Sequence, residues 1–221
     1  MKTNRFSPSD AFTLTELLIV IAIVGILASL ASVASARSFQ TVRAVSCLSN
    51  LRQWGIATHS FADDNADSLP FDGAPNGISE RDAWYVDLPP AIGLKPYHQQ
   101  PEWRTNPAVV LPNTVWLCPS NKRRSNGRIL FHYCLNRRAT VSASDRASLS
   151  STPDPGSLVW LYDNGQIAAV AAEGNAHPNA HGAGAQFLFL DGHVQRLSRP
   201  AYWDQARNRP RPDPQGLRWT R

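Results

Sequence analysis

Four side chains near the C-terminal end have the chemistry of a metal site. His177, His181 and His193 lie close in sequence to the carboxylate of Asp191. Three imidazoles and a carboxylate are an adequate ligand set for zinc. However, His193 follows a tight Asp-Gly turn, and the chain has no His-Glu-x-x-His or Gly-x-Ser-x-Gly motif. We therefore expect no enzyme, no catalytic residue and no metal site. The alternative is structural: Asp191 forms the turn, and His181 bonds to the hairpin or to a neighbouring loop.

The three cysteines, Cys47, Cys118 and Cys134, are a second set of reactive groups. In an exported chain this number predicts one disulfide and one free thiol. A bond between Cys118 and Cys134 would join two neighbouring strands, whereas a bond between Cys47 and Cys118 would tie a helix to the sheet. The residues alone leave all three pairings open.

Glu16 is a single carboxylate at the mouth of an uncharged run from Leu17 to about Ala36. A charge that enters an apolar span costs roughly 2.5–3.5 kcal/mol at its centre and less near its end. Either Glu16 lies at headgroup level, or it has a cationic partner. If the chain is cleaved between Ala11 and Phe12, the new α-amine lies one helical turn from Glu16, and the amine of a neighbouring subunit can pair with it.

These groups require a long helix to position them. No proline occurs between Pro8 and Pro70, so residues 12–62 are predicted to form one helix, with residues 1–11 as a leader. Residues 17–36 supply the roughly 20 apolar residues that a bilayer span needs. Beyond them, one face carries Val42, Val45, Leu48, Leu51, Trp54, Thr58 and Phe61, and another carries Arg43, Ser46, Asn50 and Gln53. This second half is predicted to be amphipathic and to pack on a domain.

An ordinary secretory signal is an alternative. Ala34-Ser35-Ala36 is a small-x-small pattern that follows an apolar run. The position of Glu16 and the length of the run argue against this alternative, because hydrophobic regions of such signals usually have about 7–15 residues.

The segment Ala11-Phe-Thr-Leu-Thr-Glu-Leu-Leu-Ile-Val-Ile-Ala-Ile-Val24 resembles the signal of type IV prepilins and of type II secretion pseudopilins. The resemblance implies cleavage before Phe12 by prepilin peptidase, a membrane aspartyl peptidase, and methylation of the new N-terminus. It also implies that Glu16, the fifth mature residue, acts in assembly. This chain has Ala11 where the family usually has Gly, and it lacks the proline that kinks the apolar helix of many type IV pilins.

The C-terminal region resembles a domain found behind such N-termini, which is defined by a histidine, nine residues and Asp-Gly. In this chain those positions are His181, Asp191 and Gly192. The same resemblance extends to the segments around Cys47 and Cys118. It favours a disulfide between these two, because Cys134 stands where that family more usually has a small residue.

Residues 63–198 are expected to form a periplasmic or extracellular α+β domain, in which the helix packs on a small antiparallel sheet as in pilins. Strands are predicted at Thr114–Leu117, Ile129–Leu135 and Leu158–Tyr162, with Ile167–Ala171 returning as the hairpin partner of the last. A second hairpin, Ala185–Leu190 and His193–Leu197, is predicted around a type I′ turn at Asp191-Gly192.

The charges are unevenly distributed. The run Asp63, Asp64, Asn65, Asp67 and Asp72 predicts a solvated helix end, with a calcium site as the alternative. The tail 199–221 has six arginines against two aspartates, which is most of the formal charge of +5. A solvated, poorly ordered terminus is the expected structure of this tail, against which Trp203 and Trp219 argue. No nucleic-acid-binding motif accompanies the charge, and no cofactor is expected.

The expected function is a pseudopilin of the inner membrane. It would be a single-pass subunit that prepilin peptidase processes and that assembles with other pseudopilin subunits into a filament for protein export. The alternative is a single-span anchored binding protein without a filament role, for which the tryptophans Trp84, Trp103, Trp203 and Trp219 would have to form an exposed aromatic surface.

Overall fold

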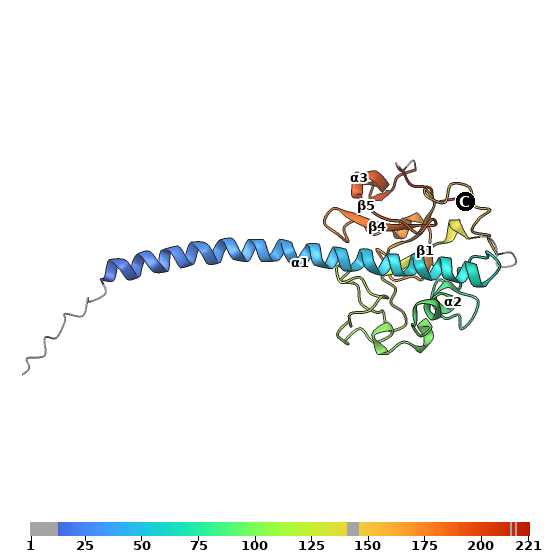
Figure 1. The fold of residues 1–221 in the computed structure, drawn as a ribbon, viewed down its shortest axis with the longest axis horizontal. Coiled ribbons are helices and arrows are strands. Elements are labelled where there is room, and N and C mark those ends of the chain that lie inside the picture. Colours follow the sequence, from blue (N-terminus) through green and yellow to red (C-terminus); the bar gives the residue numbers. More distant parts are fainter. Residues whose placement is uncertain (1–12, 141–145, 213, 215) are drawn as a thin grey trace, which may run out of the picture. The chain divides into compact units, whose positions relative to one another are not determined.

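The computed structural model describes residues 13–140, 146–212, 214 and 216–221, and for residues 30–37 it describes only the backbone. The chain divides into two compact units, Met1–Thr41 and Val42–Arg221. The long helix α1 (Leu14–Asp64) contributes to both (Figure 1). The second half of the helix is therefore part of the globular unit.

One stripe of α1 in the second unit is buried. Cys47, Leu51, Trp54 and Thr58 follow the spacing of three and four residues that keeps side chains on one helix face, and all are at most 1% exposed. Two sequence predictions about this face are wrong. Asn50 is buried with the stripe, whereas Val42 and Val45 are exposed. At about 100° per residue Val45 lies roughly 200° from Cys47, on the opposite side of the helix.

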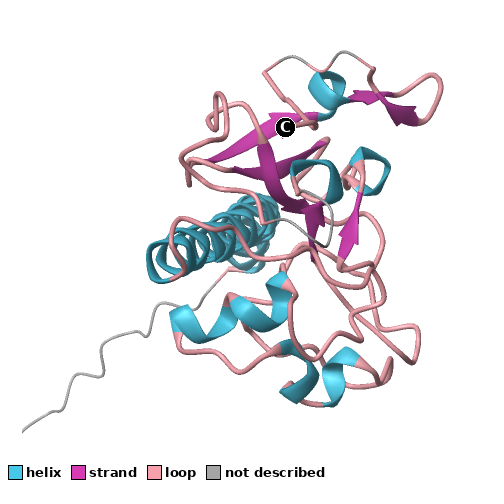
Figure 2. Ribbon diagram, turned by 90° about the vertical axis from the view of Figure 1, so that its right-hand side faces the viewer, coloured by secondary structure: helices cyan, strands magenta, loops and turns pink. Residues whose placement is uncertain are grey.

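The helix packs on a five-stranded sheet, which makes this an α+β fold (Figure 2). The strand order is β3-β1-β2-β4-β5, and every pairing is antiparallel except the parallel pair of β1 and β3. The strands are β1 (Tyr133–Asn136), β2 (Val159–Asp163), β3 (Val170–Ala171), β4 (Gly184–Phe189) and β5 (Val194–Ser198). The predicted fold class is confirmed, and the sheet is mostly antiparallel.

Two strand predictions are wrong. Thr114–Leu117 is a turn, in which the Leu117 amide donates to the Thr114 carbonyl. Its carbonyls accept bonds from side chains of α1, because Asn50 donates to Leu117 and Trp54 to Val115. The segment around Val170 does not return as a hairpin beside β2; it pairs with β1.

The sheet has an apolar core on each face. Leu135, Leu161 and Leu188 belong to the core on the α1 face, whereas Phe187 and Phe189 of β4 belong to the opposite core. This is the alternation expected along a strand. A bulge between Val159 and Leu161 shifts the register of β2. As a result both Trp160 and Leu161 join the α1 side, where the Trp160 indole donates to Thr58.

The C-terminal tail covers the second face, so the prediction of a solvated terminus is wrong. Tyr202, Trp203, Leu217 and Trp219 are all less than 10% exposed and belong to the core on that face. The tail contains α3 (Arg199–Tyr202), β6 (Trp203–Asp204) and β7 (Arg209–Pro210), and β6 and β7 form a two-stranded ribbon. Backbone bonds between Arg218 and both Ser157 and Val159 attach its end to β2.

The region between α1 and β1 contains only short helices. They are α2 (Trp84–Asp87), η1 (Pro89–Ile92), η2 (Tyr97–Gln99) and η3 (Glu102–Arg104), with η4 (Arg137–Ala139) and η5 (Glu173–Asn175) further along the chain. An aromatic cluster holds the region against α1. Trp84 and Trp116 contact Trp54 edge-on at 5.4 and 4.7 Å between ring centroids, and Tyr97 stacks on Phe131 at 4.0 Å. Such pairs contribute about 0.5–1.5 kcal/mol each beyond the burial of area.

Candidate functional site

The predicted processing junction, Ala11 and Phe12, lies outside the described residues. Glu16 lies within them, and it forms a capping box at the start of α1. The Thr13 amide and hydroxyl donate to the Glu16 carboxylate at 2.9 and 2.7 Å, and the Glu16 amide donates back to the Thr13 hydroxyl at 3.2 Å. This reciprocal arrangement satisfies amides that a helix start otherwise leaves free. The sequence Thr-x-x-Glu signals this motif directly.

The first unit is apolar on all sides of its helix. Leu17, Leu18, Ile19, Val20 and Ile21 are consecutive, so they point in every direction around the axis, and each is 48–61% exposed. A helix that is apolar all round normally lies in a protein core or in lipid. Among the described residues, no helix is both long and apolar enough to cross a membrane. The span predicted at 17–36 includes residues 30–36, whose side chains lie outside the described set.

The second unit joins Cys47 of α1 to Cys118 by a disulfide, the pairing that the resemblance implies. Cys134 is a free, buried thiol in the core on the tail side of the sheet. Burial raises its pKa to about 12, so it stays protonated and unreactive at neutral pH. The chemically distinctive cysteines are therefore the two in the disulfide.

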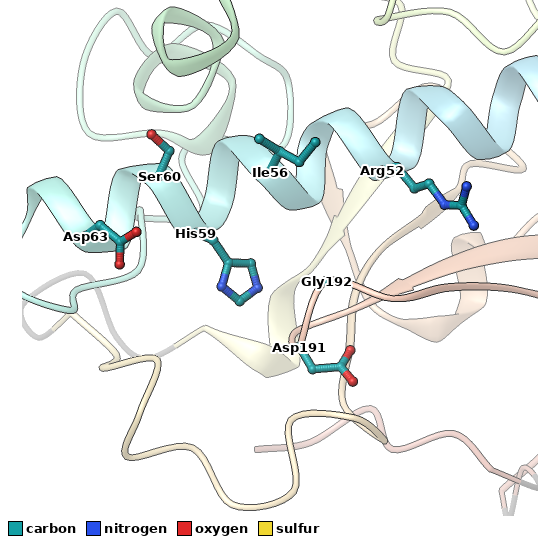
Figure 3. Close-up of a pocket in the computed structure, with 7 residues that line it drawn as sticks. All are labelled: Arg52, Ile56, His59, Ser60, Asp63, Asp191 and Gly192. Carbon is teal, nitrogen blue, oxygen red and sulfur yellow. The ribbon is translucent and has the colours of Figure 1, made fainter.

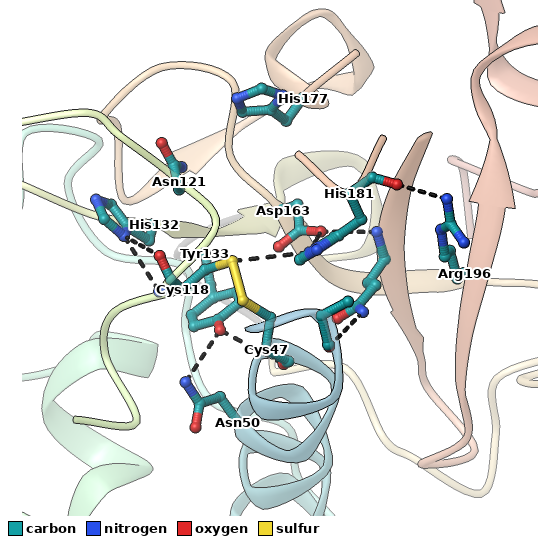
Figure 4. Close-up of polar contacts among 12 residues, drawn as sticks. Cys47, Asn50, Cys118, Asn121, His132, Tyr133, Asp163, His177, His181 and Arg196 are labelled. Atoms are coloured by element: carbon teal, nitrogen blue, oxygen red, sulfur yellow. Dashed lines mark hydrogen bonds and ion pairs between the residues drawn. A yellow bond between two sulfur atoms is a disulfide. The ribbon is translucent and has the colours of Figure 1, made fainter. Parts of the chain in front are cut away.

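His181 lies against this disulfide (Figure 4). Its Nε2 atom is 3.7 Å from Cys118 Sγ and 2.9 Å from a carboxylate oxygen of Asp163, and both side chains of the His–Asp pair are 1% exposed. The same Asp163 oxygen accepts the backbone amide of Gln186 at 2.7 Å. Gln186 in turn donates to the Ala44 carbonyl of α1. His181 therefore sits where the helix, the loop of Cys118, β2 and β4 meet.

Asp163 is the partner that the sequence analysis missed. The Asp-Asn-Gly sequence at 163–165 is typical of a turn, whereas the structure makes Asp163 the buried last residue of β2. Its neighbour Asn164 is buried too, and donates to the carbonyls of Phe131 and Ala168. The available signal was that Asp163 follows directly on an apolar strand, where a carboxylate needs a partner.

Asp191 and Gly192 form the turn between β4 and β5, but the turn is not type I′. A type I′ turn needs positive φ at both central residues, and only Gly192, with φ +91°, has it. The Gly192 amide donates to Phe189, and the Phe189 amide to His193, which makes a three-residue loop closed by glycine. The Asp191 carboxylate accepts the His193 amide at 3.1 Å and contacts the His193 ring at 2.6 Å.

This turn borders a groove of about 560 Å³ on α1 (Figure 3). One wall is the stretch of α1 from Arg52 to Asp63, and the other is Asp191 and Gly192. His59 points toward the turn, and its Nε2 atom is buried without a hydrogen-bond partner among the described residues. Ile56, in the same wall, is 62% exposed.

The histidine and carboxylate set that suggested zinc does not come together. Within the described residues, one group of three possible metal ligands has all its donor atoms within 4.8 Å, and it is Cys47, Cys118 and His181. Neither Asp191 nor His193 belongs to it. In the acidic run after α1, the Asp67 carboxylate accepts bonds from Ser148 and Ser150, so it organises the chain locally. The calcium alternative there stays a prediction.

His132 makes the fold sensitive to acid. Its Nδ1 accepts a hydrogen bond from the Cys118 amide at 3.1 Å, and its Nε2 donates one to the Arg123 carbonyl at 3.1 Å. A ring with one accepting and one donating nitrogen is the neutral imidazole. Burial lowers its pKa from 6.5 to about 4. Below pH 6.5 the imidazole of His132 binds a proton in the unfolded chain, whereas in the folded chain it does so only near pH 4. The free energy of unfolding should therefore fall as the pH drops through this interval, by about 2 kcal/mol between pH 7 and pH 5 from this residue.

The measurement is urea unfolding, followed by tryptophan fluorescence at pH 7 and pH 5, of the wild type and of His132→Gln. The glutamine amide can accept and donate as the imidazole does, and it does not titrate. Asp87 acts in the opposite direction, since burial raises its pKa to about 6 and the folded chain binds that proton first. Because Asp87 is present in both proteins, only the difference between them reports on His132, and an equal loss in both would contradict the assignment.

The prokaryotic N-terminal methylation motif matches residues 8–32 of this chain. This match supports a type IV prepilin-like family, which is structural rather than enzymatic, and it includes the predicted junction and Glu16. No curated protein and no solved structure matches the chain.

Proposed function

We propose that this chain is a pilin-like structural subunit, specifically a pseudopilin that is assembled into a type II secretion-type or type IV pilus-like filament for protein export. Prepilin peptidase cleaves it between Ala11 and Phe12, the new N-terminus is methylated, and the apolar helix holds the subunit in the inner membrane until assembly. The observation that carries the proposal is the methylation motif at residues 8–32.

The exposed apolar helix supports a subunit that is assembled or membrane-bound rather than free in water. Residues such as Leu17, Ile21 and Leu27 are 55–61% exposed, and each would gain about 1.5–3 kcal/mol from full burial. In the membrane, lipid covers them, and in a filament the helices of neighbouring subunits do so. Since lipid is already apolar, the transfer itself is nearly neutral, whereas release of the subunit into water is costly.

The processing step is tested by the mass of the N-terminal peptide of protein purified from membranes. The proposal expects a chain that begins at N-methyl-Phe12. A chain that begins at Arg37 would instead indicate a secreted domain, and an intact Met1 would indicate a plain anchor.

Glu16→Ala should be cleaved normally and yet enter filaments poorly, because in this proposal the carboxylate pairs with the α-amine of the next subunit. The capping box offers matched controls. Glu16→Gln keeps an oxygen that can accept from Thr13 but loses the charge, so it should fail as the alanine variant does. Thr13→Ala removes the capping hydroxyl but keeps the charge, so it should assemble.

The readout is the share of each variant that sediments with filaments from cells that hold the assembly machinery. Normal incorporation of Glu16→Gln would mean that capping, and not the ion pair, is what assembly needs.

The anchored binding protein is less well supported. It required an exposed aromatic surface, but Trp84, Trp103, Trp203 and Trp219 are all 0–9% exposed.

A further inference from the structure

Several side-chain atoms that could bind a metal ion lie together around His181. The Sγ atoms of Cys47 and Cys118 and the Nε2 atom of His181 lie within 4.8 Å of one another, and all three residues are buried. Asp163 adds a carboxylate oxygen 2.9 Å from the same Nε2 atom (Figure 4). Two sulfurs and one imidazole therefore meet at one place, and the carboxylate of Asp163 lies beside the imidazole.

Two of the spacings among these atoms are close to those of a tetrahedral zinc site. Zinc–sulfur bonds of about 2.3 Å and zinc–nitrogen or zinc–oxygen bonds of about 2.0–2.2 Å put sulfur and nitrogen roughly 3.5 Å apart, and nitrogen and oxygen roughly 3.3 Å apart. The structure has 3.7 Å between Cys118 Sγ and His181 Nε2, and 2.9 Å between that nitrogen and Asp163. The two sulfurs depart from this geometry because a bond joins them. Asp163 departs from it too, since it is not among the donors that all lie within 4.8 Å of one another, so its carboxylate has to move toward the sulfurs when the ion binds.

Three polar atoms at this place are buried without a hydrogen-bond partner: Asp163 Oδ1, His181 Nδ1 and Gln186 Oε1. An unsatisfied buried polar atom costs about 1–3 kcal/mol, and native structures keep few of them. His181 and Asp163 are thus not fully used by their contacts with each other and with the disulfide. Of the three, Asp163 Oδ1 is the atom that a bound cation would satisfy, because His181 would bind the ion through Nε2.

We propose that reduction of the disulfide converts this cluster into a zinc site, with Cys47, Cys118, His181 and Asp163 as ligands. A dithiol reductant gives two electrons and two protons to the disulfide and becomes a disulfide itself. Zn²⁺ then displaces the protons of the two new thiols, and the Nε2 lone pair of His181 and an oxygen of Asp163 complete the set. Thiolate and imidazole ligands select zinc over calcium or magnesium, which prefer oxygen.

Replacing the disulfide by a zinc ion would keep Cys47 and Cys118 linked. The disulfide ties residues 71 positions apart, one on α1 and one in the loop before β1. A zinc ion bound by the same two sulfurs keeps that long loop closed in the reduced chain. The globular unit would therefore hold together in either redox state, provided that zinc is present.

The test uses the full-length chain in detergent, reduced with a phosphine and freed of it without oxygen. The phosphine becomes its oxide, with an oxygen atom from water. Zinc is titrated against a chromophoric chelator, and cobalt(II) reports the ligands by its thiolate charge-transfer and tetrahedral ligand-field absorption. The expected result is one ion per reduced chain, none per oxidised chain, and a cobalt spectrum with two thiolates.

Two variants make the outcome specific to this site. His181→Ala should bind zinc at least tenfold more weakly. Cys134→Ala should bind as the wild type does, because Cys134 lies in the core on the other face of the sheet. Near-UV circular dichroism shows whether the reduced chain is folded, and recovery of a native spectrum on addition of zinc would support the proposal.

Three results would overturn it: a reduced, folded chain that binds no zinc, a reduced chain that zinc does not refold, or a His181→Ala variant with wild-type affinity. The last would mean that the thiols alone bind the ion.

Discussion

Deletion of residues 199–221 is expected to abolish the native fold of the globular unit. The tail forms most of the layer that the described residues place over the second face of the sheet, through Tyr202, Trp203, Leu217 and Trp219, and Ala176 adds to it from the segment after β3. Without it, Tyr162, Phe187 and Phe189, all at most 1% exposed, would face water. Each fully buried large apolar side chain contributes roughly 1.5–3 kcal/mol. Their combined loss approaches the 5–15 kcal/mol that a domain has in total.

The truncated chain should lose its near-UV circular dichroism and bind a hydrophobic dye. The milder variant Trp219→Ala should remain folded but lose about 3–5 kcal/mol of unfolding free energy. Trp219 contacts Tyr162 edge-on at 5.2 Å, and its carbonyl accepts the Asn136 side chain, so it joins the tail to two strands.

A charge control separates the covering role of the tail from its basic character. Arg209→Gln with Arg211→Gln changes two exposed side chains, and it should alter stability by no more than about 0.5 kcal/mol per site. A truncated chain as stable as the wild type would show that the tail is an accessory, as the charge pattern alone suggested.

The sequence contained signals both for and against a solvated tail. The six arginines of residues 199–221 and its prolines favoured a solvated terminus. The contrary signal lay in β4 itself, where Phe187 and Leu188 point to opposite faces and are both apolar. A strand that is apolar on both faces is buried on both, so a second covering layer was implied. α1 supplies one layer, and the tail supplies most of the other.

The elements that were predictable are those that local rules determine. Helix α1 follows from a long stretch without proline and a spacing of three and four residues, and the β4–β5 hairpin follows from alternation around Asp-Gly. β3 was not predictable in this way. It has only two residues and pairs with β1 through a parallel contact. Asn164 determines this path, because its side chain binds the Phe131 and Ala168 carbonyls and turns the chain past β2.

The residues around His181 were likewise predictable only in part. The resemblance drew attention to His181, Cys47 and Cys118, which the structure places together. It did not identify Asp163, because that contact depends on how β2 and the loop before β4 meet. Conversely, Asp191 and Gly192 are close to His181 in sequence, but they organise the hairpin turn beside the α1 groove.

Removal of the disulfide should produce the second large loss of stability. The bond closes a loop between residues 71 positions apart, and in the chain-entropy model such a loop contributes about 4 kcal/mol. Cys47→Ala with Cys118→Ala should therefore lower the free energy of unfolding by about that amount, because it opens the loop and leaves no unpaired thiol at either of these two buried positions. The measurement is urea unfolding of the oxidised proteins without zinc.

Cys134→Ala is the matched control, because it removes a buried sulfur that closes no loop and should cost only about 1 kcal/mol. Equal losses in the two proteins would mean that the bond contributes only packing. A loss that the double variant and the reduced, zinc-free wild type share, and that Cys134→Ala does not show, would mean that the tie between α1 and the loop before β1 holds the globular unit together.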